Sequence, residues 1–394
     1  MVKITSREEL EQWLEDKPRD WARVIAARVA LRALPYAFDR YVTAGWIAKD
    51  SLMLFRATVI AWAARSFPAC NMAAAAKAAN AASTANLPNN AAKVANAANL
   101  AVYAANVARA AADASVWTTI SHDCNWLESA GDGDASRRLT QVVLWPAKEV
   151  AGWSAAWDSA AKRLRQLDQG YDVWIDWYER RIKGYDEAFD IPGDKDRTED
   201  KAILRRLADA TDKDFWGKGA THVNTTLQSW IDEARIEAQI QEIIRKLRGG
   251  ASAHYGAQDE LDKRAALLAE LDRMLGKPPQ GRFGIGGNSP PESIDSPSAP
   301  IALPQDLRDP IEAISAELEK TEPDALRVAE QLSLMHRVGR KLQKMASIAG
   351  DEFAKTFGGE LAKGAAKVVT RGVYLAIATP LIFKILDWLA PLIH

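Results

Sequence analysis

The spacing of aromatic residues is the feature that most constrains how this chain can fold. Nine of its 14 tryptophans lie within residues 117–230. Trp174, Trp177 and Tyr178 stand at positions i, i+3 and i+4, which places all three on one face of a helix. Such a face is too large and too apolar to be left in water, so it must pack against other elements. The block therefore predicts closely packed helices.

Two interpretations of this aromatic block are open. An aromatic cage or a platform for stacking nucleic-acid bases is one, and a tryptophan-rich core is the other. Stacking platforms lie on basic surfaces, whereas Asp172, Asp176 and Glu179 interleave these aromatic residues. The formal net charge of the chain is only −1, which provides no general attraction for nucleic acid. Both observations favour the core, and we expect no nucleic-acid partner.

Helix signals run along the chain, and strand signals are nearly absent. Ser6 followed by Glu9 forms a capping box, which predicts a short helix through Trp13. A second helix is expected to run from Pro18 to a proline stop at Pro35, and a third over residues 47–67. We predict an all-α protein.

Further helix limits are expected in the second half of the chain. An apolar stripe over residues 227–247 is closed by Gly249 and Gly250. Asp309 and Glu312 form another capping signature, and Pro323 begins a further helix.

Changes in composition divide the chain into six predicted parts. An Ala- and Asn-rich repeat indicates a hairpin of two close-packed helices, or an Ala-rich coil that binds a partner helix. A Pro-, Gly- and Ser-rich stretch is too polar to form a packed core and predicts a linker. The parts are N-terminal helices (1–68), the hairpin (69–116), a Trp-rich domain (117–276), the linker (277–304), an amphipathic helical arm (305–371) and a hydrophobic helix (372–393).

The arm combines a heptad-like stripe with a reversal of charge. Apolar and small residues follow a four-three spacing over residues 328–353, which fits self-association or packing on the chain's own body equally well. Residues 301–334 carry a balance of −5, and residues 335–371 carry +5. Basic residues next to an apolar segment are attracted to an anionic membrane surface. The candidates for this contact are Lys355, Lys363, Lys367 and Arg371.

The C-terminal segment, residues 372–393, is the strongest candidate for a membrane contact. As a helix its 22 residues would measure about 33 Å, close to the hydrocarbon thickness of a bilayer. Pro380, Lys384 and Asp387 interrupt it, each charge costing about 3 kcal/mol at mid-bilayer. The two charges lie one turn apart and could pair, while Trp388 and other apolar residues surround them. We predict a membrane helix, with a helix of the body's own core as the alternative.

Candidates for chemistry are few. His122 and Cys124 flank Asp123, but residues one and two apart point to different helix faces, so no nucleophile or metal site is expected there. His222 lies in a Gly- and Lys-containing sequence that lacks the order of a phosphate-binding loop. We predict no catalytic, cofactor-binding or metal-binding residue and no enzyme activity. With Cys70, Cys124 is one of only two cysteines, which fits a reducing compartment.

Four sequence blocks carry a resemblance. They are VWTTISHDCNWLESAG, LWPAKEVAGWSAAWDSAAKRLRQL, YDVWIDWYERRIKG and DFWGKGATHVNTTLQSWI, followed by the linker GIGGNSPPESI. In this order they resemble an uncharacterised family of alphaproteobacterial proteins that share the Ala-rich region, the WxxWY block and the linker. The resemblance implies no activity. Gly287 stands where that linker usually carries a histidine, so a metal or phosphate role for the linker does not transfer.

Three functional hypotheses follow from the sequence. The first is a non-enzymatic, membrane-tethered interaction or scaffold protein, with a cytoplasmic body and a C-terminal helix in the inner membrane. Its expected partners are membrane lipids, a protein of unknown identity and a second copy of the chain through residues 328–353. The alternative is a membrane-disrupting effector of cell death or phage defence, whose tail helices the body keeps silent. The third is an enzyme that the motifs do not reveal.

Overall fold

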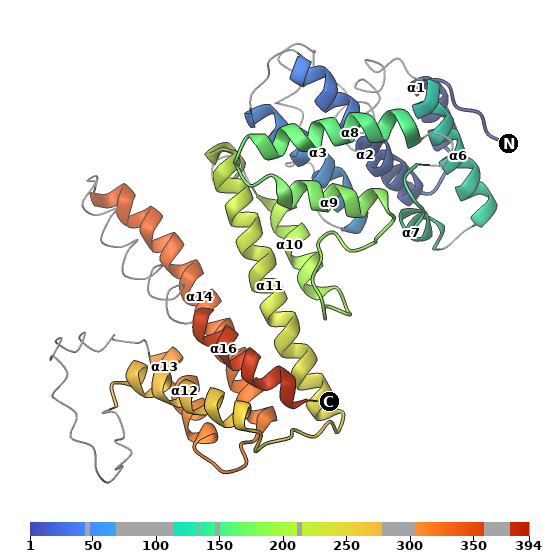
Figure 1. The fold of residues 1–394 in the computed structure, drawn as a ribbon. Helices are drawn as coiled ribbons and strands as arrows, with labels where there is room; N and C mark the ends of the chain where they lie inside the picture. Colours follow the sequence, from blue (N-terminus) through green and yellow to red (C-terminus); the bar gives the residue numbers. More distant parts are fainter. Residues whose placement is uncertain are drawn as a thin grey trace, which may run out of the picture. The chain divides into compact units, whose positions relative to one another are not determined.

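The computed structural model describes residues 1–43, 48–67, 114–131, 134–145, 150–210, 215–277, 305–357 and 379–393. These residues form 13 α-helices and no strand, which confirms the all-α prediction (Figure 1). The predicted hairpin (69–116) and linker (277–304) lie almost wholly outside the described residues. The chain divides into two compact units, Met1–Arg235 and Ile236–His394. The boundary falls within a helix, where the sequence indicated no division.

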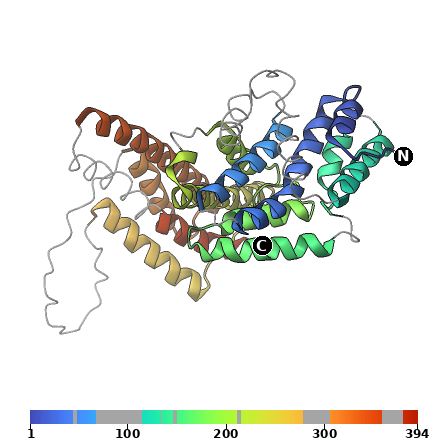
Figure 2. The ribbon, with the colours of Figure 1, turned by 90° about the horizontal axis from the view of Figure 1, so that it is seen from above.

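Unit 1 combines the N-terminal helices with the Trp-rich region in one core. Helices α8 and α9 lie next to one another, and α2 packs against both of them (Figures 1 and 2). The helices of unit 1 are α1 (Arg7–Leu14), α2 (Arg19–Thr43), α3 (Ala48–Ser66), α6 (Ala114–Ala130), α7 (Ala135–Thr140), α8 (Val150–Gln166), α9 (Asp172–Ile182), α10 (Thr198–Asp209), the short 3₁₀ helix η2 (Trp216–Lys218) and the first part of α11 (Ala220–Arg248).

The capping box of α1 forms with a small variation. The Ser6 hydroxyl accepts a hydrogen bond from the Glu9 amide at 3.2 Å, as predicted. The Glu9 carboxylate reaches one residue further back than the motif requires and accepts from the amide of Thr5 at 2.6 Å. Both contacts satisfy amide donors that a helix start leaves unpaired.

Helix α2 continues through Pro35, so the predicted stop at this proline is wrong. A proline inside a helix has no amide donor for the carbonyl four residues earlier, here that of Leu31. The hydroxyl of Tyr178, on α9, donates to this carbonyl at 3.1 Å. A side chain from a distant part of the sequence thus supplies the bond that the proline removes. The third helix, by contrast, ends at Ser66, close to its predicted limit.

The aromatic residues form the core of unit 1. Trp174, Trp177 and Tyr178 are all at most 1% exposed, which confirms the core interpretation of the WxxWY block. Phe55 on α3 stacks on Trp174 with ring centroids 5.3 Å apart. The Trp174 indole donates to the Asn224 side chain at 2.7 Å, so this buried N–H is satisfied.

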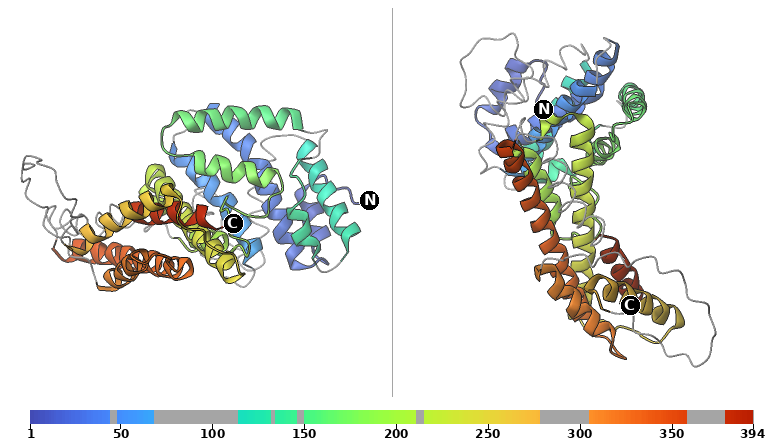
Figure 3. Two further views of the ribbon diagram at one scale, coloured as in Figure 1. Left: turned by 60° about the horizontal axis from the view of Figure 1, so that its bottom comes forward. Right: turned by 90° about the vertical axis from the view of Figure 1, so that its left-hand side faces the viewer.

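Unit 2 gathers segments from both sides of the predicted linker. Helix α12 packs against α13, α14 packs against α13, and α16 contacts both α12 and α14 (Figure 3). The described first part of the predicted arm is therefore in the same core as residues 236–277. The helices of unit 2 are the last part of α11, α12 (Gln258–Leu275), α13 (Gln305–Leu318), α14 (Ala325–Phe357), α16 (Thr379–Leu389) and the short 3₁₀ helix η4 (Ala390–Leu392).

Helices α13 and α14 explain part of the predicted heptad-like stripe. Its first members, Val328, Leu332 and Met335, are fully buried in the core of unit 2. This half of the stripe thus packs on the chain's own body, while the side chains from position 342 onward lie outside the described residues. Helix α13 begins at Gln305, ahead of the predicted start at Asp309, and Pro310 lies inside its first turns.

Replacing Tyr178 by Phe tests how α2 passes Pro35. The variant removes the donor to the Leu31 carbonyl and the acceptor of the Trp153 indole, which lies 3.0 Å from the hydroxyl. Leaving buried polar groups unpaired should lower the free energy of unfolding by about 1–3 kcal/mol. Urea denaturation measures this loss. Tyr185→Phe, at an exposed tyrosine, is the matched control and should change stability by less than about 0.5 kcal/mol. Equal stability of the two variants would contradict the role of Tyr178.

Candidate functional site

Helix α16 carries most of its apolar residues on one side. Its buried residues face the core of unit 2, and Pro380, Phe383, Lys384 and Asp387 lie on the exposed side. Phe383 thus adds an exposed apolar side chain beside the two charges, while most apolar residues of α16 are buried. Together with the turn that follows, eight apolar side chains are buried: Leu381, Ile382, Ile385, Leu386, Trp388, Leu389, Leu392 and Ile393.

The two charges of α16 pair with α12 and not with one another. Lys384 forms an ion pair with Glu270, and Asp387 lies 3.1 Å from the ammonium group of Lys263. The predicted Lys384–Asp387 pair is therefore wrong. Both charges lie at the edge of the contact between α16 and α12, within reach of oppositely charged side chains of α12. They are well exposed, so each ion pair contributes little to stability.

Trp388 is held by buried contacts, unlike the two exposed charges. Its indole is 1% exposed and donates to the Glu260 carboxylate at 3.1 Å. Tyr255 stacks on the same indole with ring centroids 6.3 Å apart. Glu260 is itself buried, and it also accepts from the Gly256 amide at 3.2 Å and pairs with Arg264 at 3.3 Å. One carboxylate thus joins the C-terminal helix to α12 and to the loop that precedes α12.

The end of the chain closes on the same loop. The amide of His254 donates to the Leu392 carbonyl at 3.1 Å, and Ala253 pairs with Ile393 in an isolated antiparallel bridge. The Tyr255 hydroxyl donates to the Pro323 carbonyl at 2.6 Å, and burial raises the pKa of Tyr255 to about 12. We name residues 253–256 together with Glu260 the clamp, because they hold the C-terminal turn from two sides.

The remaining membrane candidates are less well placed. Lys355 lies in α14, but its side chain is outside the described residues, as are Lys363, Lys367 and Arg371. Within the described parts of the chain, no helix combines the length and the apolar character needed to cross a bilayer.

In unit 1, buried charged side chains gather around Asp123. Arg28 and Arg32, both on α2, donate to this carboxylate at 2.6–3.2 Å. They also donate to the carbonyl of Leu139 in the last turn of α7 and to those of Val142, Val143 and Leu144 in the loop that follows. This loop meets the one after α9 so closely that a Cβ at Gly184 would lie 2.5 Å from the Gln141 carbonyl oxygen. Two arginines and one carboxylate therefore fix the loop after α7.

The neighbours of Asp123 do not join it in a reactive group. His122 is exposed, while Cys124 is buried and its thiol has a pKa raised by burial. A thiol that resists ionisation is a poor nucleophile. His222 lies in the first turn of α11, partly buried. No cluster of three or more metal-ligating side chains occurs among the residues that can be described.

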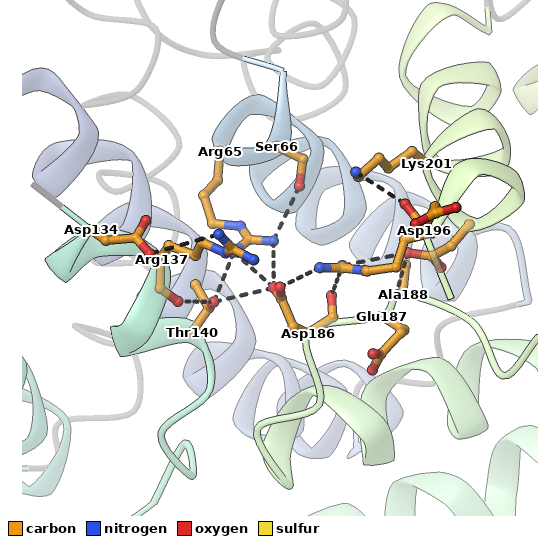
Figure 4. A network of polar contacts seen from close by, with 12 residues as sticks. Arg65, Ser66, Asp134, Arg137, Thr140, Asp186, Glu187, Ala188, Asp196 and Lys201 are labelled. Atoms are coloured by element: carbon orange, nitrogen blue, oxygen red, sulfur yellow. Dashed lines mark hydrogen bonds and ion pairs between the residues drawn. The ribbon is translucent and has the colours of Figure 1, made fainter. Parts of the chain in front are cut away.

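Asp186 is the centre of a second polar network in unit 1 (Figure 4). One of its oxygens accepts from Arg65 at 3.2 Å and from Thr140 at 3.3 Å, and the other pairs with Arg197. Asp200 nearby accepts the amides of Ala188 and Phe189 at 3.0 and 2.7 Å. The network joins α3, α7 and the start of α10 to the loop between α9 and α10, and both of its carboxylates accept hydrogen bonds within it.

Sequence reasoning missed Glu260, Asp123 and Asp186. Each is one carboxylate among 52 acidic residues, and its partners lie on other helices. A partial signal existed for Arg28 and Arg32, since two arginines four apart within the apolar run of α2 indicate buried partners.

Comparisons with known protein families, with curated proteins and with solved structures find no match to this chain. The resemblance to alphaproteobacterial proteins therefore stays a prediction.

Acid should weaken unit 1 through Asp123 and Asp186. Burial alone would raise the pKa of each carboxyl, but the charges of their arginine partners more than offset it, and both pKa values are lowered. Such groups contribute stability above the unfolded pKa of about 4, which is lost as pH falls toward the folded pKa. Urea denaturation between pH 6 and pH 3 should show a steadily falling free energy of unfolding.

Asp123→Asn isolates one of these groups. The variant should lose about 3 kcal/mol at pH 6, because two buried arginines lose their counter-charge, and its stability should depend less steeply on pH. Asp176→Asn, at an exposed carboxylate of α9, should leave both quantities close to the wild-type values. An unchanged pH slope in Asp123→Asn would show that this carboxylate is not the source of the acid sensitivity.

Proposed function

We propose that the protein is a non-enzymatic helical interaction protein that reaches a membrane surface through its C-terminal helix. The observation that carries the proposal is the amphipathic form of α16, with most of its apolar residues on one face and Lys384 and Asp387 on the other. Helices of this form bind in the plane of a bilayer interface, with the charged side toward water. The proposal thus replaces a spanning helix by an interfacial one.

The free energies of two alternative locations for α16 support this choice. The eight buried apolar side chains are stabilised by on the order of 10 kcal/mol relative to water, whether unit 2 or a lipid interface covers them. The charges at mid-bilayer would cost about 3 kcal/mol each, but at an interface they stay hydrated. An interfacial location therefore keeps the apolar side chains of α16 buried without the cost of burying its charges, whereas a spanning location adds that cost.

A second candidate is the membrane-disrupting effector. It is favoured by the docked position of α16, in which the body covers the apolar face that would disturb a membrane. In this hypothesis the docked helix is the silent state. Both candidates require α16 to bind a membrane, and they differ in whether the bound helix makes the bilayer permeable.

Vesicle flotation tests the proposal. The full chain should float with vesicles that contain anionic lipid, and less with neutral ones, because the charge of residues 335–371 is +5. Ile385→Asp with Leu389→Asp places charges on the apolar face and should abolish flotation. Lys384→Gln, on the exposed side of α16, is the control and should retain most of it.

Three outcomes can be told apart. Flotation without release of an entrapped dye supports the interaction protein. Flotation with dye release favours the effector. If the wild-type chain does not float with either kind of vesicle, the membrane proposal is wrong and α16 is a permanent part of the core of unit 2.

A further inference from the structure

Helix α16 must detach from unit 2 before its apolar face can bind a membrane, because that face is buried in the core of unit 2. Besides its buried apolar side chains, which pack in the core of unit 2, α16 makes two kinds of polar contact there, exposed ion pairs at the edge and a buried hydrogen bond at the clamp. Exposed ion pairs break at little cost because water solvates both partners. Buried polar contacts are costly to break one partner at a time, since the group left behind has no water to bond.

We infer that the buried hydrogen bond between Glu260 and Trp388 is the lock that holds the C-terminal helix in its docked position on unit 2. This inference rests on the proposed function, because it names the step that would control access to the membrane. Glu260 is 5% exposed and Trp388 is 1% exposed, and the two side chains meet at 3.1 Å. Among the polar contacts between α16 and α12 that described side chains make, this is the one with both partners buried.

Glu260 is in contact with two further segments of unit 2, so a movement of either one would shift its carboxylate. Through Gly256 it is joined to the loop that pairs with the end of the chain. Through Arg264 it is joined to the turn between α13 and α14, because this guanidinium donates to the carbonyls of Lys320 and Thr321 at 3.0 and 3.2 Å. A partner that rearranges either segment would also disturb the acceptor of the Trp388 indole. A partner that binds unit 2 near the clamp could in this way weaken the Glu260–Trp388 hydrogen bond and release α16.

Hydrogen exchange in the full chain tests the lock. Glu260→Ala removes the acceptor of the Trp388 indole and should speed amide exchange in Thr379–Leu389 by about 10- to 100-fold. Glu270→Ala removes the edge ion pair with Lys384 and a long one with Arg273 within α12, and it should speed exchange in α16 by less than about threefold. Exchange in α13, which has its own packing with α14, should stay unchanged and excludes general unfolding of unit 2.

A double variant shows whether the effect comes from this one contact. Trp388→Phe keeps an aromatic ring and removes the donor, so it should also speed exchange in α16. Combined with Glu260→Ala, it should add much less than the product of the two single effects, since each change removes the same hydrogen bond. Fully multiplicative effects, or no faster exchange in Glu260→Ala, would overturn the lock.

Flotation of the same variants separates the lock from the proposed function. Glu260→Ala should bind anionic vesicles more strongly than wild type, and Glu270→Ala should not. Faster exchange in α16 without stronger flotation would support the lock and overturn the membrane proposal. Stronger flotation without faster exchange would overturn the lock, because the helix would then reach the membrane by another route.

Discussion

Asp123 is the point on which the arrangement of unit 1 depends. It is 1% exposed, and its charge is balanced by two arginines of α2 that also bind the backbone of the loop after α7. A buried carboxylate without such partners would be protonated or would destabilise the fold by several kcal/mol. Three chain segments are thus placed by the need to satisfy one charged group. The Asp186 network does the same for α3, α7 and the loop between α9 and α10.

The fold class and the aromatic core could be predicted because they rest on local spacing. The WxxWY block lies on one helix, and its burial follows from periodicity and size alone. The end of α2 could not be predicted, because the bond that lets the helix pass Pro35 comes from Tyr178, 147 positions away in the sequence. Sequence rules for helices predict that a proline leaves one carbonyl without a donor, but they cannot identify a distant side chain that supplies one.

The C-terminal segment shows the same limit in another form. Its length and apolar content are those of a membrane helix, and these properties do not distinguish lipid from the apolar faces of neighbouring helices. The difference lies in Lys384, Asp387 and Trp388, whose polar groups all find partners on α12. These partners are spread over α12 from Glu260 to Glu270, and the sequence gives no sign that this helix and the end of the chain are neighbours.

The bond between Tyr178 and the Leu31 carbonyl also bears on the order in which unit 1 folds. Until α9 arrives, the carbonyl at position 31 has no helical donor, and the two halves of α2 are free to bend about Pro35. We therefore expect α2 to become continuous through Pro35 late in folding, since contacts that close a long loop form slowly. The segment before Pro35 can become helical early, and the register of the segment after it is set only when the aromatic core assembles.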